Sequence, residues 1–369
     1  MKTADLQERA GAHTFERSAR GPSLATVAQL DGFDEIIDVR SQSEFAEDHI
    51  PGAINCPVLD DAQRAEVGTI YKQVSAFDAK KIGAALVSEN IALHLRTKFH
   101  DKPRTWRPLV YCWRGGGRSG ALAHVLGEIG WKAGRLDGGY KAYRRAVIGE
   151  LEVLPARFAW RVICGVTGTG KSRLLRALHA AGAQVLDLEA LAAHRGSVLG
   201  NLPNEPQPPQ KLFESLIWHA LRGFDRARPV YVESESKKVG ALRVPQALIE
   251  AMWAGTPVVI EAPVNLRVEL LKQEYAHFLA DPDALGRQLD CLAALHGHER
   301  IEQWKTQAHA HDWDALTADL LLRHYDPAYT RAITRHYPTL AAAPRLILTA
   351  THVAEFTRLA RECVTLESR

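Results

Sequence analysis

One eight-residue stretch limits how this chain can fold more than any other. Residues 165–172 read Gly-Val-Thr-Gly-Thr-Gly-Lys-Ser, between an apolar run at 158–164 and a helical pattern at 173–181. A strand, a glycine-rich turn and a helix in this order match the pattern GxxxxGK[ST], in which backbone N–H groups surround a diphosphate. We therefore expect an α/β domain with a diphosphate site at this turn. Its predicted ligands are Gly165, Thr167, Gly168, Thr169, Gly170, Lys171 and Ser172.

Polar residues follow two later apolar runs of the same domain. Asp187 lies at the end of one run, and Glu233 and Glu235 lie at the end of the other, where proteins with this loop carry a metal-binding carboxylate. Arg195 lies one short helix beyond Asp187. We expect these four residues to support the diphosphate site, and Mg²⁺ is compatible with it. No firmly bound cofactor is predicted.

A second glycine-rich turn lies in the first half of the chain. Residues 111–120 read Tyr-Cys-Trp-Arg-Gly-Gly-Gly-Arg-Ser-Gly, again between an apolar run and a helical pattern. The glycines let N–H groups converge on one point, and two arginines and the helix N-terminus add positive potential there. Such surroundings lower the pKa of a cysteine, whereas a buried structural cysteine needs neither glycines nor arginines. The predicted catalytic residues are Cys112, Arg114 and Arg118, and the predicted anion-binding residues are Trp113, Gly115, Gly116, Gly117 and Ser119.

Further motifs surround the cysteine turn in a fixed order. Asp38-Val39-Arg40 ends one short strand, residues 49–53 (His-Ile-Pro-Gly-Ala) turn into another, and residues 136–140 (Leu-Asp-Gly-Gly-Tyr) read as a closing strand and turn. With the Cys112 turn they resemble the rhodanese fold from about residue 24 to 146. The resemblance implies a parallel-sheet domain whose thiolate carries sulfur or selenium. The expected domains are an N-terminal extension (1–22), a rhodanese-like domain (23–150) and a P-loop NTPase-like α/β domain with a helical C-terminal part (151–369).

The length of the cysteine turn narrows its chemistry. Cys112 to Arg118 gives the spacing Cys-x5-Arg, one residue longer than the usual sulfur-transferring rhodanese loop. Phosphatases of this fold have such a wider cradle because they bind a tetrahedral phosphate group. The turn contains no Asp or Glu to act as general acid for a leaving alcohol. We therefore expect this turn to bind a phosphate-sized anion at Cys112. It lacks the general acid that phosphatase chemistry requires.

Composition sets outer limits on these interpretations. The 369 residues are 46% hydrophobic and 24% charged, as in an ordinary globular protein, and the net charge of +3 is too small to argue for a nucleic-acid partner. Five scattered cysteines indicate a reducing compartment rather than a disulfide framework or a zinc site. Neither a secretory signal nor a membrane span is visible, so we expect a cytoplasmic protein without membrane contact.

Two local clusters have simple interpretations. Basic residues at 96–107, with Phe99 and Trp106 interleaved, fit a phosphate-contacting patch for nucleic acid. A solvated helix and loop explains the same residues and is preferred. Four histidines at 296–311 lack the spacing to carboxylates or cysteines that a metal site requires, so no metal site is predicted there.

The two glycine-rich turns in this order resemble the bacterial tRNA 2-selenouridine synthase family. The other segments that carry the resemblance are residues 68–73 (Gly-Thr-Ile-Tyr-Lys-Gln), 194–197 (His-Arg-Gly-Ser), 210–215 (Gln-Lys-Leu-Phe-Glu-Ser) and 233–236 (Glu-Ser-Glu-Ser). The resemblance implies an enzyme that acts on the wobble 2-thiouridine in the anticodon loop of tRNA. It implies S-geranylation by geranyl diphosphate and then replacement of the S-geranyl group with selenium from selenophosphate. A selenophosphate-producing enzyme is an implied partner.

This resemblance implies a role for each turn. Cys112 would take up selenium while Arg114, Arg118 and the loop amides hold the phosphate part. Lys171 and Ser172 would stabilise the diphosphate that leaves when the geranyl C–O bond breaks. Two interpretations from other classes stay open. One is an ATP-dependent kinase or NTPase fused to a rhodanese sulfurtransferase or phosphatase-like module, and the other is a non-catalytic regulator whose turns sense phosphate.

Overall fold

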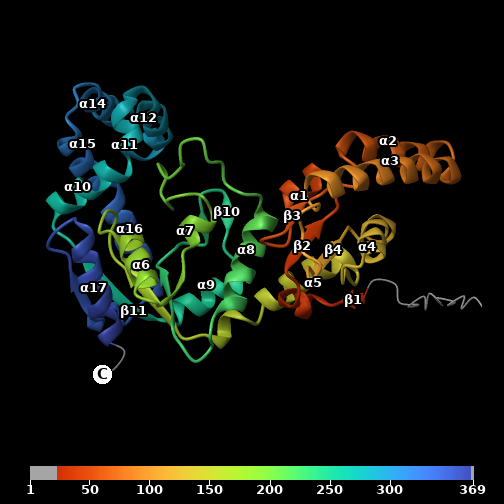
Figure 1. Ribbon diagram of the computed structural model, residues 1–369. Coiled ribbons are helices and arrows are strands. Elements are labelled where there is room, and N and C mark those ends of the chain that lie inside the picture. The colour runs from red at the N-terminus through yellow and green to blue at the C-terminus, as the bar shows by residue number, and fades with distance from the viewer. Residues whose placement is uncertain (1–22, 367–369) are drawn as a thin grey trace, which may run out of the picture. The chain divides into compact units, whose positions relative to one another are not determined.

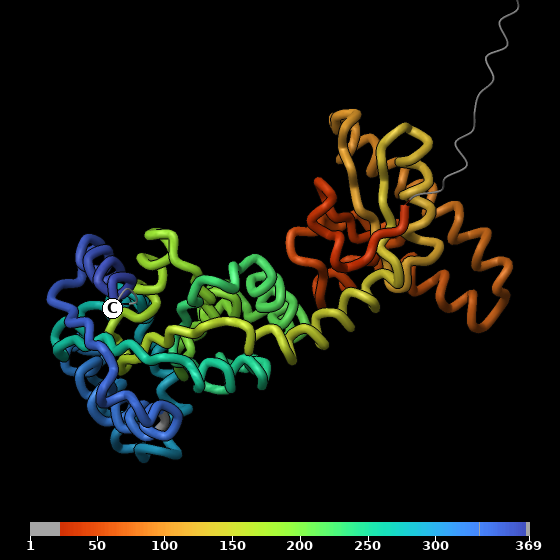
Figure 2. Tube along the Cα trace, turned by 90° about the horizontal axis from the view of Figure 1, so that it is seen from below, coloured from red at the N-terminus to blue at the C-terminus, as the bar shows by residue number. Residues whose placement is uncertain are grey.

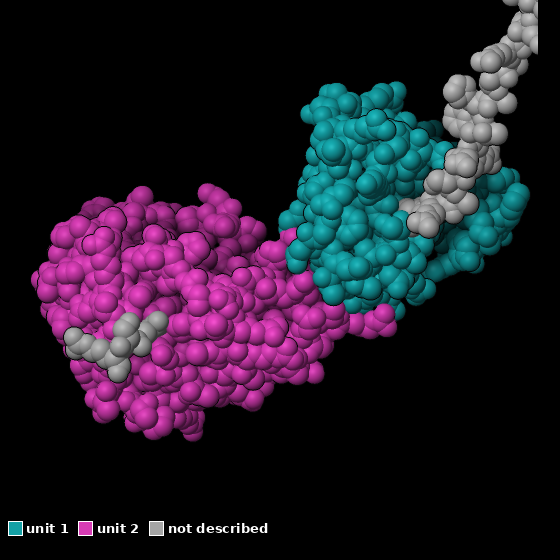
Figure 3. All heavy atoms as spheres, turned by 60° about the horizontal axis from the view of Figure 1, so that its bottom comes forward, with its two compact units in different colours: residues 1–42, 52–142 teal, residues 43–51, 143–369 magenta. Residues whose placement is uncertain are grey.

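The structure is a computed structural model that describes residues 23–366 (Figure 1). The expected N-terminal extension, residues 1–22, lies outside the described residues. The chain divides into two compact units, one of residues 1–42 and 52–142 and the other of residues 43–51 and 143–369 (Figure 3). Figure 2 follows the Cα trace through each of them. Each unit is built around its own five-stranded parallel sheet.

The sheet of the first unit has the strand order β1-β5-β4-β2-β3, and all its pairs are parallel. Every residue of its central strand, β4, is buried. This is the parallel-sheet, rhodanese-like architecture that the sequence predicts. The strands are β1 (Ser23–Ala25), β2 (Glu35–Asp38), β3 (Ile54–Asn55), β4 (Pro108–Tyr111) and β5 (Gly134–Leu136). The helices up to residue 151 are η1 (Val27–Gly32), α1 (Gln42–Glu47), α2 (Asp61–Gln73), α3 (Ala76–Thr97), α4 (Gly117–Ile129) and α5 (Gly139–Leu151).

Helices α2 and α3 form a long pair lying side by side (Figure 1). Each begins at a capping side chain, Asp60 for α2 and Ser75 for α3, which accepts a hydrogen bond from an N–H group of the first turn. Just beyond α3, Phe99 and Trp106 are 0% and 4% exposed and belong to the core. Their rings are therefore not available for stacking on bases, which agrees with the preferred interpretation of the basic segment.

The sheet of the second unit has the strand order β12-β11-β6-β8-β7 and is also parallel throughout. Its strands are β6 (Trp160–Cys164), β7 (Gln184–Leu186), β8 (Val230–Glu233), β11 (Thr256–Glu261) and β12 (Arg345–Ile347). A small antiparallel pair consists of β9 (Lys238–Val239) and β10 (Leu242–Arg243). The helices and turns of this α/β part are η2 (Pro155–Arg157), α6 (Lys171–Ala180), α7 (Leu188–Leu191), α8 (Gln210–Gly223), α9 (Gln246–Trp253), α10 (Val264–Glu274), η5 (Leu340–Ala342) and α17 (Val353–Thr365).

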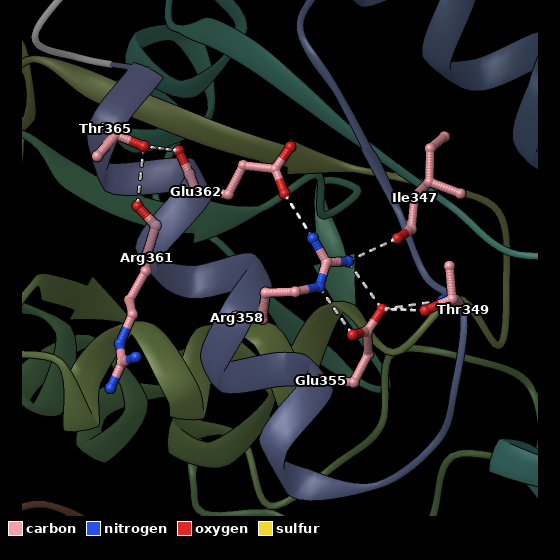
Figure 4. Close-up of polar contacts among 7 residues, drawn as sticks. All are labelled: Ile347, Thr349, Glu355, Arg358, Arg361, Glu362 and Thr365. Carbon is pink, nitrogen blue, oxygen red and sulfur yellow. Dashed lines mark hydrogen bonds and ion pairs between the residues drawn. The ribbon is translucent and has the colours of Figure 1, made fainter.

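Helix α17 is tied to the end of strand β12 by a group of charged side chains (Figure 4). The Glu355 carboxylate accepts hydrogen bonds from Thr349 N–H at 3.0 Å and from Arg358 at 2.8 Å. Arg358 also donates to the Ile347 carbonyl at 3.1 Å. The hydrogen bond from Arg358 lowers the pKa of Glu355 to about 2. The apolar face of α17 packs on α6 and contributes Phe356 to the core of this unit.

A helical region lies in the chain between β11 and β12 and has an apolar core of its own, centred on Trp304. It consists of α11 (Ala276–Ala280), α12 (Pro282–Leu289), η3 (Asp290–Leu292), α13 (Ala293–His296), α14 (His298–His309), α15 (Trp313–Leu320), a π-helical turn η4 (Leu321–Tyr325) and α16 (Asp326–His336). None of the helices within residues 23–366 has both the length and the apolar character needed to cross a membrane.

Candidate functional site

Cys112 lies directly after β4, at the base of the loop that leads into α4. The loop is held against the start of α5, because Tyr140 N–H donates to the Cys112 carbonyl at 2.9 Å. Gly139 makes this approach possible, since a β-carbon there would collide with that carbonyl. Gly115 has φ +67° and a β-carbon would lie 2.8 Å from the Leu136 carbonyl, so it too must be glycine. Thus the closing segment predicted from sequence packs against the cysteine loop.

The Cys112 thiol is 3% exposed and lies 3.2 Å from the Ser119 hydroxyl. Burial acts to raise the pKa of Cys112, but hydrogen bonds from the Ser119 hydroxyl and from the backbone N–H groups of Ser119 and Arg114 act in the opposite direction. The Arg118 charge adds to them, and the net effect is a lowered pKa. The structure thus surrounds the sulfur with donors, as expected for a nucleophilic thiolate.

The arginines of the loop differ in their setting. Arg114 is exposed and Arg118 is half-buried. Arg114 supplies its backbone N–H to the sulfur, whereas Arg118 supplies charge. Gly116 is the N-cap of α4 and Gly117 its first residue, so the helix N-terminus lies within the predicted anion cradle.

An aromatic pair stands beside this cradle. Trp113 is 38% exposed and stacks on Tyr140, with ring centroids 5.2 Å apart and an interplanar angle of 28°. The Arg40 guanidinium lies 4.0 Å from the Tyr140 ring centroid and is itself held by Asp38 at 2.6 Å. Asp38 and Arg40 therefore act as a buried support for the aromatic pair rather than as free charges.

The second glycine-rich loop joins β6 to α6, as the sequence predicts. Gly168 and Gly170 have φ angles of +83° and +80°, a conformation that favours glycine. Thr169 is fully buried, and its hydroxyl donates to the Val166 carbonyl at 2.9 Å. A β-carbon at Gly165 would lie 2.6 Å from the Ile260 carbonyl, so the loop passes close over strand β11. The loop backbone is thereby fixed before any ligand binds.

Side chains from α10 and α16 hold the loop in place. The hydroxyl of Tyr329 accepts a hydrogen bond from Gly165 N–H at 2.7 Å. Arg267, which is 3% exposed, donates to the Thr167 carbonyl at 2.8 Å and pairs with Asp326 through two hydrogen bonds. These three side chains lie far along the chain from the loop and belong to no local motif, so the sequence alone does not mark them.

Three carboxylates gather around the Ser172 hydroxyl and Lys171. The carboxylates of Glu189, Glu233 and Glu235 have oxygens within 4.8 Å of one another. Ser172 donates to Glu189 at 3.0 Å and to Glu233 at 3.1 Å. Glu189 was not predicted, although it lies only two residues beyond Asp187, at the same strand end.

The electrostatics of this cluster disfavour three ionised carboxylates side by side. Burial and the neighbouring carboxylates raise the pKa of Glu189 to about 10 and that of Glu235 to about 8. Burial also raises the pKa of Glu233. Burial acts to lower the pKa of Lys171, but the charges of Glu233, Tyr329, Glu189 and Glu235 together outweigh burial, so the pKa is raised and the lysine stays charged. Such a site favours a proton or a cation.

A cavity of about 1210 Å³ opens over this loop. Asp187 lines it and caps α7 by accepting a hydrogen bond from Ala190 N–H at 2.9 Å. Arg195 lines it with its guanidinium 4.9 Å from the Tyr275 ring, and one buried nitrogen of this group has no hydrogen-bond partner among the described residues. All four supporting residues predicted from sequence thus line a single cavity with Lys171 and Ser172.

Family models match both parts of the chain. A model described as the rhodanese-like domain matches residues 24–146, and one described as the tRNA 2-selenouridine synthase AAA domain matches residues 158–284. Among solved structures, a rhodanese-related protein from Thermoplasma volcanium is 18% identical and covers 33% of this chain and 91% of its own. Its TM-score of 0.22 is too low to carry an argument.

Curated relatives align with most of the chain. The tRNA 2-selenouridine synthase of Hydrogenovibrio crunogenus is 36% identical over 68% of this chain and 72% of the relative. That of Sulfurovum sp. is 33% identical over 82% and 89% of the two chains, and that of Alcanivorax borkumensis is 32% identical over 83% and 91%. Since these relatives are at least 32% identical and the matches cover more than two thirds of both chains, the chain belongs to the tRNA 2-selenouridine synthase family of enzymes.

Proposed function

We propose that this enzyme forms 2-selenouridine at the wobble position of tRNA in two steps. The first step is S-geranylation of 2-thiouridine by geranyl diphosphate, and the second is replacement of the geranylthio group by selenium from selenophosphate. The observation that carries the proposal is the pairing of two phosphate-sized loops with different chemistry in one chain. One holds a cysteine whose pKa is lowered, and the other holds a charged lysine among carboxylates. The names of the relatives support the product, and the two donors are our assignment.

Geranyl diphosphate is assigned to the Lys171 loop. The loop amides and the Lys171 ammonium bind the diphosphate and stabilise the charge that develops on it as the C–O bond breaks. The 2-thiouridine sulfur attacks the first carbon of the geranyl group, and diphosphate leaves with the bonding electron pair. Because the leaving group is already an anion of the kind that this loop binds, the step needs no nucleotide hydrolysis.

The residues beside Lys171 also fit a magnesium ion. Mg²⁺ prefers oxygen ligands, and the Ser172 hydroxyl with the carboxylates of Glu189, Glu233 and Glu235 offers them within a small volume. Their raised pKa values show that the site gains from added positive charge. When bound, Mg²⁺ supplies further charge neutralisation to the diphosphate.

Selenophosphate is assigned to the Cys112 loop. The resemblance implies that Cys112 takes up selenium, but a cysteine perselenide cannot form from selenide-level selenium without an oxidant. We therefore assign a different step, in which the Cys112 thiolate attacks phosphorus and breaks the P–Se bond. Selenide leaves with the electron pair, so no oxidation state changes. Hydrogen selenide is a far stronger acid than an alcohol, and selenide therefore leaves without a proton donor. This agrees with the absence of Asp and Glu from residues 112–119. Water then hydrolyses the phosphocysteine, while selenide attacks C2 of the modified uridine and expels the geranylthiolate.

Mass spectrometry of tRNA nucleosides tests the proposal directly. A tRNA with wobble 2-thiouridine is incubated with the enzyme and geranyl diphosphate, and selenophosphate is added afterwards. We expect S-geranyl-2-thiouridine after the first addition and 2-selenouridine after the second. A parallel incubation with ATP tests the kinase or NTPase alternative. Tight ATP binding with turnover, and no reaction with geranyl diphosphate, would overturn the assignment of the Lys171 loop.

A further inference from the structure

A small apolar cavity of about 60 Å³ adjoins the large cavity over the Lys171 loop. Thr167 of the loop and Leu271 of α10 line both spaces. So do Tyr275 and Tyr325, which therefore stand at the boundary between them. Deeper in, the small cavity reaches the apolar core of the helical region and is lined by side chains that include Phe278, Leu285, Trp313, Leu316 and Leu320.

We propose that this cavity receives the far end of the isoprenoid tail of the diphosphate substrate. The diphosphate would lie on the Lys171 loop, and the chain would run over Leu271 and between the two tyrosines into the helical region. This inference rests on the proposed function, because it takes a prenyl diphosphate as the donor. It assigns the binding of the tail to residues that no sequence motif marks.

The apolar path begins at the loop itself. A β-carbon built on Gly168 would lie 3.0 Å from a methyl group of Leu271, so this side chain lies directly against the phosphate loop. The hydroxyl of Tyr275 is bound to the Ser197 hydroxyl at 3.1 Å, and its ring lies 4.9 Å from the Arg195 guanidinium. Polar groups thus hold the Tyr275 ring at the border, with the charged cavity on one side and apolar side chains on the other.

The backbone at the border is unusual. Leu321–Tyr325 forms a π-helical turn between α15 and α16. It places Leu321 in the lining of the small cavity and Tyr325 in the lining of both cavities. Single π-helical turns are rare in proteins overall, but those that occur often lie at functional sites, which fits a binding role for this border.

The size of the cavity sets a limit on chain length. A water-sized group needs roughly 10–15 Å³ of such space, so 60 Å³ holds about five non-hydrogen atoms, which is one isoprene unit. The isoprene unit of a geranyl group that is attached to the diphosphate would lie at the mouth of the cavity, beside Leu271. A fifteen-carbon farnesyl chain would have to displace core side chains such as Leu285 and Leu316, and a five-carbon chain would not reach them.

A second apolar cavity, of about 550 Å³, lies near the start of the loop and is the rival site for the tail. Tyr329 lines both it and the large cavity. The Tyr329 hydroxyl is fixed by hydrogen bonds to Gly165 N–H at 2.7 Å and to the Ser234 hydroxyl at 3.0 Å. The ring is therefore held at the border of the rival cavity, on the side of Lys171, whose ammonium is 5.8 Å from it. Ile333 also lines both of these cavities. Because a fixed, polar tyrosine hydroxyl stands at this border, whereas the small cavity is entered over the apolar Leu271 side chain, we favour the path over Leu271.

Two matched substitutions in the full chain test the proposal by titration calorimetry with geranyl diphosphate and with inorganic pyrophosphate. Thr317→Trp fills the small cavity from α15, and Thr334→Trp places the same side chain at the lining of the rival cavity from α16. We expect Thr317→Trp to weaken geranyl diphosphate binding at least tenfold and to change pyrophosphate binding less than twofold. Thr334→Trp should change both less than twofold.

Other results would overturn the inference in distinguishable ways. Unchanged geranyl diphosphate affinity in Thr317→Trp refutes it, and a selective loss in Thr334→Trp moves the tail to the rival cavity. If the unaltered protein binds geranyl diphosphate no more tightly than pyrophosphate, the proposed donor itself is wrong. Should Thr317→Trp fail to fold, the chain-length series decides. Dimethylallyl diphosphate should bind at least fivefold more weakly than geranyl diphosphate, and farnesyl diphosphate no more tightly, and any other order refutes the size limit.

Discussion

The two glycine-rich loops share a backbone plan and differ in the charged groups around them. Each follows a parallel strand, turns through glycine with positive φ (Gly115 in the first loop, Gly168 and Gly170 in the second) and ends at the N-terminus of a helix. Around Cys112 the contacts are N–H groups, a hydroxyl and an arginine, whereas around Lys171 they are three glutamates. Under the proposed function, one backbone plan would thus support a nucleophile in one unit and a cation site in the other.

A cysteine at the corresponding place in the second unit makes the difference sharper. Cys164 is the last residue of β6, just before the Lys171 loop, and Cys112 directly follows β4. Burial raises the pKa of Cys164 to about 12, while the donors around Cys112 lower its pKa. Position at a strand end therefore does not activate a thiol. The Ser234 hydroxyl and the Lys171 charge also act to lower the pKa of Cys164, but burial outweighs them, whereas the groups around Cys112 outweigh its burial.

The largest expected effect is the loss of one reaction step, and a different step for each loop. Cys112→Ser should reduce selenium incorporation at least about 10³-fold, because a serine hydroxyl is not ionised at neutral pH, and should leave geranylation intact. Lys171→Ala should slow geranylation by about 10²–10³-fold, in line with the loss of one donor to a developing anion. It should still convert tRNA that is already S-geranylated. Nucleoside mass spectrometry measures both steps, and loss of both steps in each variant would contradict this division of labour.

A smaller effect concerns the thiols alone. Iodoacetamide at pH 7 should modify Cys112 and leave Cys56 and Cys164 unmodified, since burial raises the pKa of these two to about 11 and 12. Ser119→Ala should slow alkylation of Cys112 about tenfold, because one hydrogen bond of about 1.4 kcal/mol corresponds to one pKa unit. Peptide mapping identifies the modified residue. Equal rates for Cys112 and Cys164 would show that the first loop does not activate its cysteine.

The smallest effect is a change of stability with pH in the second unit. Glu235 keeps its proton up to a pKa of about 8 when folded but loses it near 4.5 when unfolded. Folding therefore takes up a proton between these values, and metal-free stability should fall as the pH rises from 5 to 8. Added Mg²⁺ should raise the melting temperature by a few degrees, and by more at pH 8 than at pH 6. Glu235→Gln is the control, and an equal Mg²⁺ effect at both pH values would exclude this metal site.

The sequence predicted those parts of the two sites that are contiguous in the chain. The Cys112 loop, the Lys171 loop and the acids at Glu233 and Glu235 each follow a strand, and parallel strands bring their carboxyl ends to one edge of a sheet. Glu189 was not singled out from the sequence, because Asp187, two residues earlier, fits equally well the pattern of a carboxylate after a strand. In the structure Asp187 caps a helix and Glu189 binds Ser172.

Long-range contacts could not be predicted from the sequence, because the local pattern around a residue does not show which distant segment it will contact. Tyr329 and Arg267 hold the loop from helices whose own patterns show only apolar faces and surface charge. The helical pair α2–α3 was likewise not predicted, since its polar, weakly patterned sequence leaves few buried side chains. In each of these cases the role of a residue depends on the distant segment that it contacts, and the local sequence does not show that segment.

The Lys171 loop packs against Phe356 of α17, a residue that is synthesised much later than the loop itself. A β-carbon at Gly170 would lie 2.7 Å from the Phe356 ring, so α17 forms part of the floor beneath the loop. The ribosome produces Gly170 long before Phe356, and until then the loop has no such floor. We therefore expect affinity for diphosphate to appear only late in synthesis, after Phe356 has been added.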